Sequence, residues 1–212
     1  MNGITIKNNQ VVALADIPEK KYEDFFNEVL SFVSGHAQRH CVNYFGFPDG
    51  NSIKLLCCIA DDARGDITIL STRANCGERL PSLTHSLHCF EKFEREIHEN
   101  FGIGYSNHPW LKPVRYPFNR HDPSKTMDNY PFYSIDSEEL HEVGVGPIHA
   151  GVIEPGHFRF ICNGEQILHL EIQLGYQHRG IEQLMLEKKK LNQLATLAEN
   201  IAGDTAVGHS TC

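Results

Sequence analysis

Hydrophobic and polar residues alternate in two runs on either side of Asn163-Gly164, and this alternation is the clearest structural signal in the sequence. The alternating apolar positions are Phe158, Phe160 and Cys162 before this dipeptide and Leu168, Leu170, Ile172 and Leu174 after it. Strands alternate in this way because successive side chains point to opposite faces of a sheet. Asn-Gly tolerates the positive φ angles of a type I′ turn. The pattern therefore predicts a β-hairpin that turns at Asn163-Gly164.

Apolar runs also predict strands in the N-terminal half. Residues 41–47 and 53–60 flank the turn-forming sequence Pro-Asp-Gly-Asn, and residues 67–73 follow a second polar turn. Residues 53–60 are nearly all apolar, which is typical of a central strand that is buried on both faces. A further short strand or hairpin is predicted within residues 4–14.

Two stretches of this half have apolar residues at helical spacing. The first predicts a helix over residues 18–34, with Asp16 as a candidate cap and Pro18 in its first turn. The second helical region should begin at Pro81 and end at Gly102, since glycine is the usual residue after a helix C-terminus. Its apolar stripe consists of Phe90, Phe93, Ile97 and Phe101. Helices laid on the predicted sheet would complete a small α+β domain.

The C-terminal half is less regular. Residues 104–140 contain five prolines and few periodic apolar positions, a composition that favours extended chain. Helical spacing returns over residues 180–201, where Lys188 to Lys190 either interrupt the helix or face water. The chain stops at Cys212, within what the pattern predicts to be the next helix. We therefore predict a first domain over residues 1–117, a proline-containing linker over 118–142 and the beginning of a second domain over 143–212.

Composition excludes several classes of function. The 212 residues carry a net charge of −8 and no basic stripe, so nucleic-acid binding is not expected. No run approaches the roughly 18 apolar residues of a membrane span, and the polar N-terminus does not resemble a signal peptide. The seven cysteines include no Cys-x-x-Cys pair, which argues against a disulfide framework, a zinc site or an iron–sulfur site. A cytoplasmic chain is expected, with any membrane contact made through partners.

Short motifs in the second domain resemble a known family. The sequences Gly146-Pro147-Ile148-His149, 153–157 (IEPGH) and 175–182 (GYQHRGIE) resemble the start of the large subunit of membrane-bound (group 4) NiFe hydrogenases and of the D subunit of respiratory complex I. Residues 93–116 resemble the signature of the family of the complex I C subunit. The two families are fused in this order in formate hydrogenlyase-type large subunits. The resemblance implies an α+β domain like the complex I C subunit, followed by a hairpin and helix that begin a truncated large-subunit domain.

The resemblance also bears on metal binding. NiFe hydrogenases hold nickel with a Cys-Gly-x-Cys motif at a helix start, and alignment places Ala202 and Thr205 at its two cysteine positions. Neither side chain supplies a thiolate. A second cysteine pair lies near the C-terminus of that family, beyond residue 212. We therefore expect no metal ligands and no NiFe centre in this chain.

His149 and Glu154 are the candidate catalytic residues. By resemblance to the complex I D subunit, His149 would donate a hydrogen bond to a quinone oxygen and deliver a proton; the alternative is a solvated loop histidine without a ligand. Glu154 matches the glutamate that hydrogenases use to pass protons, and burial beside Ile153 and Pro155 would raise its pKa. Alternatively, its carboxylate bonds backbone amides or Arg159. His157 is expected to fix the loop by hydrogen bonding.

His178 and Arg179 are the candidate cofactor-facing residues. In both families this segment faces an iron–sulfur cluster of the neighbouring small subunit, and a guanidinium there would stabilise the reduced cluster without ligating iron. The alternative is an Arg179 paired with Glu182 or Glu171 on an exposed face.

The first domain offers no catalytic arrangement. Its charged helical residues are expected to form a solvated face or an ion-pair network; they are Glu94, Arg95, Glu96 and His98. Trp110, within the turn at residues 107–110, is a candidate interface anchor.

Taken together, the motifs predict a subunit of a membrane-associated oxidoreductase complex, related to NADH:quinone oxidoreductase, that is not catalytic in isolation. It would take part in electron transfer beside a small iron–sulfur subunit and contact membrane subunits indirectly at the inner face of the membrane. The cluster would belong to that partner, quinone is a candidate ligand of the full assembly, and the chain alone would bind no cofactor. The alternative is a non-catalytic scaffold or assembly module. The isolated chain is expected to self-associate.

Overall fold

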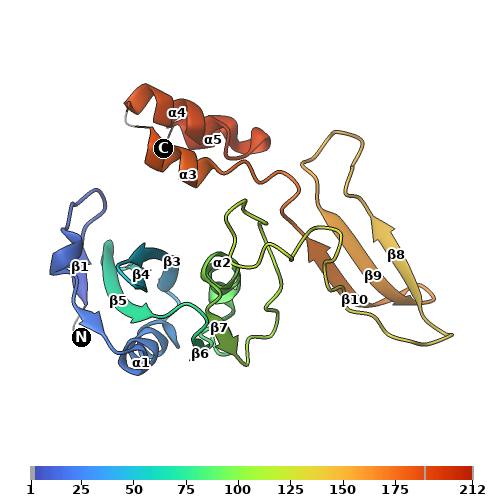
Figure 1. Cartoon of the computed structure of the whole chain (residues 1–212), viewed down its shortest axis with the longest axis horizontal. Coiled ribbons are helices and arrows are strands. Elements are labelled where there is room, and N and C mark those ends of the chain that lie inside the picture. Colours follow the sequence, from blue (N-terminus) through green and yellow to red (C-terminus); the bar gives the residue numbers. More distant parts are fainter. Residues whose placement is uncertain (1–2, 189, 212) are drawn as a thin grey trace. The chain divides into compact units, whose positions relative to one another are not determined.

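The computed structural model describes residues 3–188 and 190–211, which fall into two compact units. The first unit contains the chain up to Pro113 together with Asn119–Pro123, and the second contains Val114–Phe118 and the chain from Ser124 onward. Helices and several sheets occur together, so the predicted α+β class is confirmed (Figure 1).

A five-stranded sheet forms the centre of the first unit. Strands β3 (Arg39–Asp49), β4 (Ser52–Asp61) and β5 (Asp66–Ala74) are antiparallel neighbours, and they contain the three strands predicted from the apolar runs. Strand β1 (Ile4–Ile6) pairs with β5 in antiparallel fashion, and the short β2 (Glu19–Lys20) pairs with it in parallel. The sheet order is β1-β5-β4-β3.

Strand β4 is buried on both faces, as its apolar sequence predicted. Leu55 and its alternate neighbours pack in one core cluster with Phe25 of helix α1 (Tyr22–Val33) and Ile97 of helix α2 (Glu91–Phe101). Leu56 points to the other face and packs with Ile17 and Ile69. Both helices therefore lie on one face of the sheet, and the N-terminal segment covers the other.

The predicted start of the first helix is wrong. Pro18 precedes strand β2, and Asp16 lies in a 3-10 turn (Leu14–Asp16), so helix α1 begins at Tyr22. The reason is tertiary: the Ser71 hydroxyl donates to the Pro18 carbonyl and the Thr72 hydroxyl to the Lys20 carbonyl. Pairing with β5 holds this segment extended and overrides its local helical signals.

The start of the second helical region is also wrong. Pro81 ends strand β6 (Arg79–Pro81), which pairs in parallel with β7 (Gly104–Ser106). Helix α2 begins ten residues later, after a 3-10 turn (His88–Phe90). Its end at Gly102 is confirmed, because Gly102 has φ +69° and its N–H donates to the His98 carbonyl.

Part of the polar side of α2 is buried, including Glu94 and Arg95, which corrects the prediction of a solvated face for these two residues. The Glu94 side chain is fully buried, and its carboxylate accepts hydrogen bonds from Ser82, Leu83 and Thr84. The Arg95 guanidinium pairs with Glu91 and donates to the carbonyls of Lys112 and Pro113. The alternative prediction of ionic pairing therefore holds for Arg95, while Glu94 accepts neutral donors.

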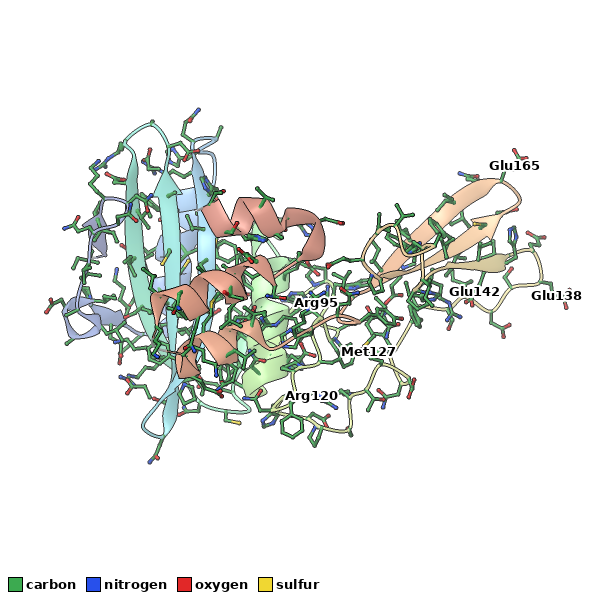
Figure 2. The ribbon with its side chains drawn as sticks, turned by 90° about the horizontal axis from the view of Figure 1, so that it is seen from above. Arg95, Arg120, Met127, Glu138, Glu142 and Glu165 are labelled. Atoms are coloured by element: carbon green, nitrogen blue, oxygen red, sulfur yellow. The ribbon has the colours of Figure 1, made fainter. Side chains whose placement is uncertain are left out.

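The second unit contains an antiparallel sheet with the order β10-β9-β8. Strands β9 (His157–Asn163) and β10 (Gln166–Gln173) form the predicted hairpin, with Glu165 at its tip (Figure 2). The turn lies one residue later than predicted, because Asn163 pairs with Gln166 and positive φ occurs at Gly164. Strand β8 (His141–Val145) was not predicted; all five of its residues are exposed, so it lacks an alternating burial signal.

The predicted helix over residues 180–201 is broken. Helix α3 (Ile181–Glu187) ends at Lys188 and helix α4 (Leu191–Glu199) begins after Lys190, both with extended backbone angles. Neither helix has a buried residue, and short helices without packing are marginal in water. A 3-10 turn (Gly203–Thr205) and helix α5 (Ala206–Thr211) follow.

Candidate functional site

The candidate site is built on the loop between β8 and β9, which contains His149 and Glu154. His149 Nε2 lies 2.8 Å from the Gly156 carbonyl oxygen, and His157 Nδ1 lies 3.3 Å from the Gly146 carbonyl oxygen. Gly146 has φ +90°, and a Cβ there would lie 2.4 Å from the Gly156 oxygen. Only glycine fits this close approach, which closes the base of the loop. The predicted loop-fixing role of His157 is thereby confirmed.

The hydrogen bond of His149 defines its neutral form. A carbonyl oxygen only accepts, so the proton of the neutral imidazole is on Nε2 and Nδ1 is an acceptor. In this arrangement Nδ1 donates to a ligand oxygen only when the ring is an imidazolium. Hydrogen-bond donation and proton delivery from Nδ1 of His149 therefore both require the imidazolium form.

Glu154 is held at the junction between α4 and α5. Its Oε1 accepts the Gly203 backbone N–H at 2.9 Å and lies 3.4 Å from Arg179 Nη2. The Gly203 hydrogen bond, with a smaller contribution from the Arg179 guanidinium, lowers the pKa of Glu154. The expected rise of this pKa by burial is therefore wrong, because the carboxylate is half-exposed and has donors on it. Of the alternatives, backbone bonding is correct, whereas Arg159 pairs with Glu142.

Arg179 connects three segments. Its Nη2 also donates to the Gln177 side chain at 2.8 Å, and its Nη1 donates to the carbonyls of Asn200 and Ile201 at 3.5 and 3.4 Å. These carbonyls follow the end of α4, where a positive charge is favourable. Neither expected acidic partner is the one found, because Glu182 pairs with Arg115 and Glu171 accepts the Tyr133 N–H.

A pocket of about 280 Å³ opens beside these residues. Its walls include Ile148, His149, Val152, Glu154, Gln177 and Asp204. Ala202 directly precedes Gly203, and Thr205 donates or accepts a hydrogen bond with His209 Nδ1 at 3.0 Å. The two positions aligned with cysteines thus present a methyl and a hydroxyl group. Among residues 3–188 and 190–211, no three His, Cys, Asp or Glu side chains gather as a metal site requires.

The structure brings together some of the predicted residues. Glu154 and Arg179 form one ion pair, and His149 and Glu154 line one pocket. His178 is half-buried, and its backbone N–H donates to the Gly175 carbonyl. Sequence reasoning missed Gln177 and Gly203. Gln177 lies in the quoted motif, but nothing local links Gly203 to Glu154, which is 49 residues away.

The domain that precedes this site identifies the family. Residues 5–127 match the family described as respiratory-chain NADH dehydrogenase, 30 Kd subunit. The match covers more than half of the chain, so the chain belongs to this family, and the resemblance drawn from residues 93–116 is confirmed.

The chain is also similar in sequence to curated proteins. The chain is 33% identical to hydrogenase-4 component G of Escherichia coli K12 over 148 residues, which is 62% of this chain and 27% of that protein. It is 32% identical to formate hydrogenlyase subunit 5 of the same organism over 90 residues, which is 42% of this chain and 16% of the relative. It is 22% identical to the NADH-quinone oxidoreductase C/D subunit of Enterobacter sp. strain 638 over 214 residues, covering 85% of this chain and 35% of the relative.

These relatives are named as components or subunits of larger enzymes, so this chain is related to the C subunit of complex I and to group 4 hydrogenase components. The chain spans between about a sixth and about a third of their lengths. Within the part of the chain that the structure describes, no helix has the length and hydropathy of a membrane span.

Proposed function

We propose that this chain acts as an electron-transfer subunit, or as part of one, in a membrane-associated oxidoreductase assembly related to NADH:quinone oxidoreductase and group 4 hydrogenases. It would lie beside a small iron–sulfur subunit and lack a NiFe centre of its own. Contact with membrane subunits would be indirect, at the inner face of the membrane. The observation that carries the proposal is the Glu154–Arg179 pair, which joins the motif loop between β8 and β9 to the segment that follows β10. Glu154 also accepts the Gly203 N–H, and Arg179 donates to the carbonyls of Asn200 and Ile201.

Arg179 is the residue proposed to face the partner's cluster. Its side chain is 38% exposed, so a positive charge is available beside a docked partner. The nearby Glu154 carboxylate offsets part of this charge. The cluster potential would therefore depend on both members of the pair, with opposite signs.

Glu154 and His149 remain the proposed proton-handling residues of the pocket. Glu154 is ionised in its present hydrogen bonds, and His149 gains a second donor only on protonation. A quinone headgroup is the ligand class that would use such a donor, and it would enter only in the complete assembly. The alternative function, a scaffold without electron transfer, requires neither a ligand nor a nearby cluster.

The proposal is tested in the assembled complex, recovered by an affinity tag on this chain in its native source. Arg179→Met should lower the midpoint potential of the nearest cluster, because a positive charge that favours the reduced state is lost. Glu154→Gln should raise it, and Arg159→Met should leave it unchanged, since Arg159 pairs with Glu142. If the assembly stays intact and neither Arg179→Met nor Glu154→Gln changes the midpoint potential of the cluster, the scaffold alternative would be supported.

Metal content provides a second test. Ala202 and Thr205 supply no thiolate, so the purified chain should contain no stoichiometric nickel or iron. Elemental analysis that finds about one nickel per chain after chelation would contradict the proposal.

A further inference from the structure

Cys76 and His121 form a thiol–imidazole pair in the first unit, remote in sequence from the motif loop. Cys76 lies in the exposed turn between β5 and β6, and its Sγ is 3.5 Å from His121 Nδ1. The two residues are 45 positions apart, so the fold, and not the local sequence, brings them together. A nucleophile within hydrogen-bond reach of a base is the arrangement that activates thiols for reaction.

The imidazole is held in position by the end of α2. The His121 backbone N–H donates to the Glu99 carbonyl at 2.9 Å. Its ring lies directly over Gly102, where a Cβ would come within 2.4 Å of the ring carbon Cδ2. A side chain at position 102 would exclude the ring from this place. The base is thus oriented by a third element, as in other activated nucleophiles.

Three other cysteines of the first unit have raised thiol pKa values. Cys57 is fully buried and its pKa is raised well above the usual value by that burial. Burial also raises the pKa of Cys58 and, although its residue is exposed, that of Cys89. Raised thiol pKa values reduce the thiolate population that reacts. Cys89 therefore provides an internal comparison, because it is exposed and burial raises the pKa of its thiol.

We propose that Cys76, with His121 as its general base, is a site of thiol–disulfide exchange with small disulfides. The Cys76 sulfur attacks one sulfur of the disulfide while the thiol proton passes to His121 Nδ1. A new S–S bond forms, the original S–S bond breaks, and the second sulfur leaves as a thiolate that takes up a proton. No other oxidant is needed.

The exchange would also affect the local structure. A mixed disulfide on Cys76 removes the thiol from His121 and adds bulk beside the ring. The segment Asn119–Pro123, which belongs to the first unit, would then lose its contact with the turn between β5 and β6, while the His121 N–H bond to the Glu99 carbonyl does not involve the thiol. The pair thereby couples a thiol modification to the attachment of this segment.

The test uses the reduced, intact chain and oxidised glutathione, with the modified peptides quantified by mass spectrometry at early times. Cys76 should react about tenfold or more faster than Cys89, in line with the usual gain from a positioned base. His121→Gln should reduce the Cys76 rate to about that of Cys89. His88→Gln, an exposed histidine next to Cys89, should leave the Cys76 rate unchanged.

A second measurement, on the denatured wild-type chain, makes the test independent of whether the variants fold. In concentrated urea the rates at Cys76 and Cys89 should become similar, because the His121 contact is lost. Equal rates in the folded wild-type chain would overturn the proposal. So would a Cys76 rate that is unchanged in folded His121→Gln, since reactivity would then come from exposure alone.

Discussion

At the scale of single residues, Glu94 is a fully buried carboxylate at the centre of a hydrogen-bond cluster in the first unit. Four donors converge on its carboxylate: the hydroxyls of Ser82 and Thr84 and the N–H groups of Leu83 and Thr84. His108 Nε2 lies 3.8 Å from the same carboxylate, with its side chain fully buried. The Glu94 side chain thus connects helix α2 by hydrogen bonds to the turn after β6.

Glu94→Ala should destabilise the chain by about 3 kcal/mol or more, because it leaves several buried donors without an acceptor. Urea unfolding followed by the fluorescence of Trp110, the only tryptophan, measures this loss. Lys92→Ala, on the exposed side of the same helix, should change stability by no more than about 0.5 kcal/mol. Equal effects of the two substitutions would contradict the role assigned to Glu94.

Glu154 should titrate below the ordinary glutamate value of about 4.3. Its pKa is lowered by the Gly203 hydrogen bond and by Arg179, so the stability from these contacts is fully present above the unfolded-state pKa. It is lost as the pH falls through the lower folded-state pKa. The carboxyl carbon shift and the Gly203 amide shift should follow this one transition in NMR. An amide shift that is insensitive to Glu154→Gln would show that the contact is absent.

At the residue scale, the sequence did not predict the hydrogen-bond and ion-pair partners of its candidate site residues. The motifs at residues 153–157 and 175–182 drew attention to Glu154 and Arg179, and the structure pairs these two residues. The expected rise of the Glu154 pKa and the alternative acidic partners of Arg179 were wrong, because burial and pairing here depend on a third segment around Gly203. Glu94 was assigned to a solvated face for a similar reason, since its donors belong to a turn that the sequence pattern had interpreted as helix.

At the scale of elements, the sequence predicted helices and strands correctly where their burial matches their own apolar pattern. It failed where pairing with a distant strand, or full exposure, decides the structure. Both the position of strand β4 and its burial were predicted, because its residues are apolar on both faces and both faces are buried. Helix α1 begins later than its local signals indicated, because strand β2 pairs with β5. Strand β8 was missed because its exposed residues carry no pattern of burial.

Gly102 and Gly35 allow a matched test of a helix end. Both have positive φ, but a Cβ added at Gly35 would meet nothing within 4 Å, whereas one at Gly102 would meet the His121 ring. Gly35→Ala should cost about 1–2 kcal/mol from the left-handed backbone alone. Gly102→Ala should cost more in urea unfolding, because a steric clash is added. Equal costs would mean that the His121 ring moves aside, and the Cys76 reaction rate would then fall.

At the scale of the whole molecule, apolar burial is unevenly distributed between the two units. Both hydrophobic core clusters consist of first-unit residues. In the second unit, the strand register places Phe158 opposite Ile172 and Phe160 opposite Leu170, on one face of its sheet. The opposite face is contacted by the segment at residues 127–133, through Glu171, Gln173 and the Phe132 ring.

The apolar face of the second sheet therefore remains largely open. Its exposed members are Val143, Val145, Ile167, Leu170 and Ile172. Contiguous apolar surface of more than a few hundred Å² is normally covered by a partner. The sequence already indicated that apolar surface would stay exposed in the second unit. One hairpin and short helices cannot bury all of the apolar residues around the hairpin against one another.

The isolated chain should accordingly self-associate through its second unit. Light scattering should show species larger than a monomer, and limited proteolysis should remove residues beyond about 124 before it cuts the first unit. Leu170→Asp with Ile172→Asp should weaken association by about tenfold or more, because charge replaces apolar contact. Val42→Asp, at an exposed apolar position of the first unit, should have no such effect. A strictly monomeric chain, with both units equally protected in hydrogen exchange, would show that the open face is stable in water without a partner.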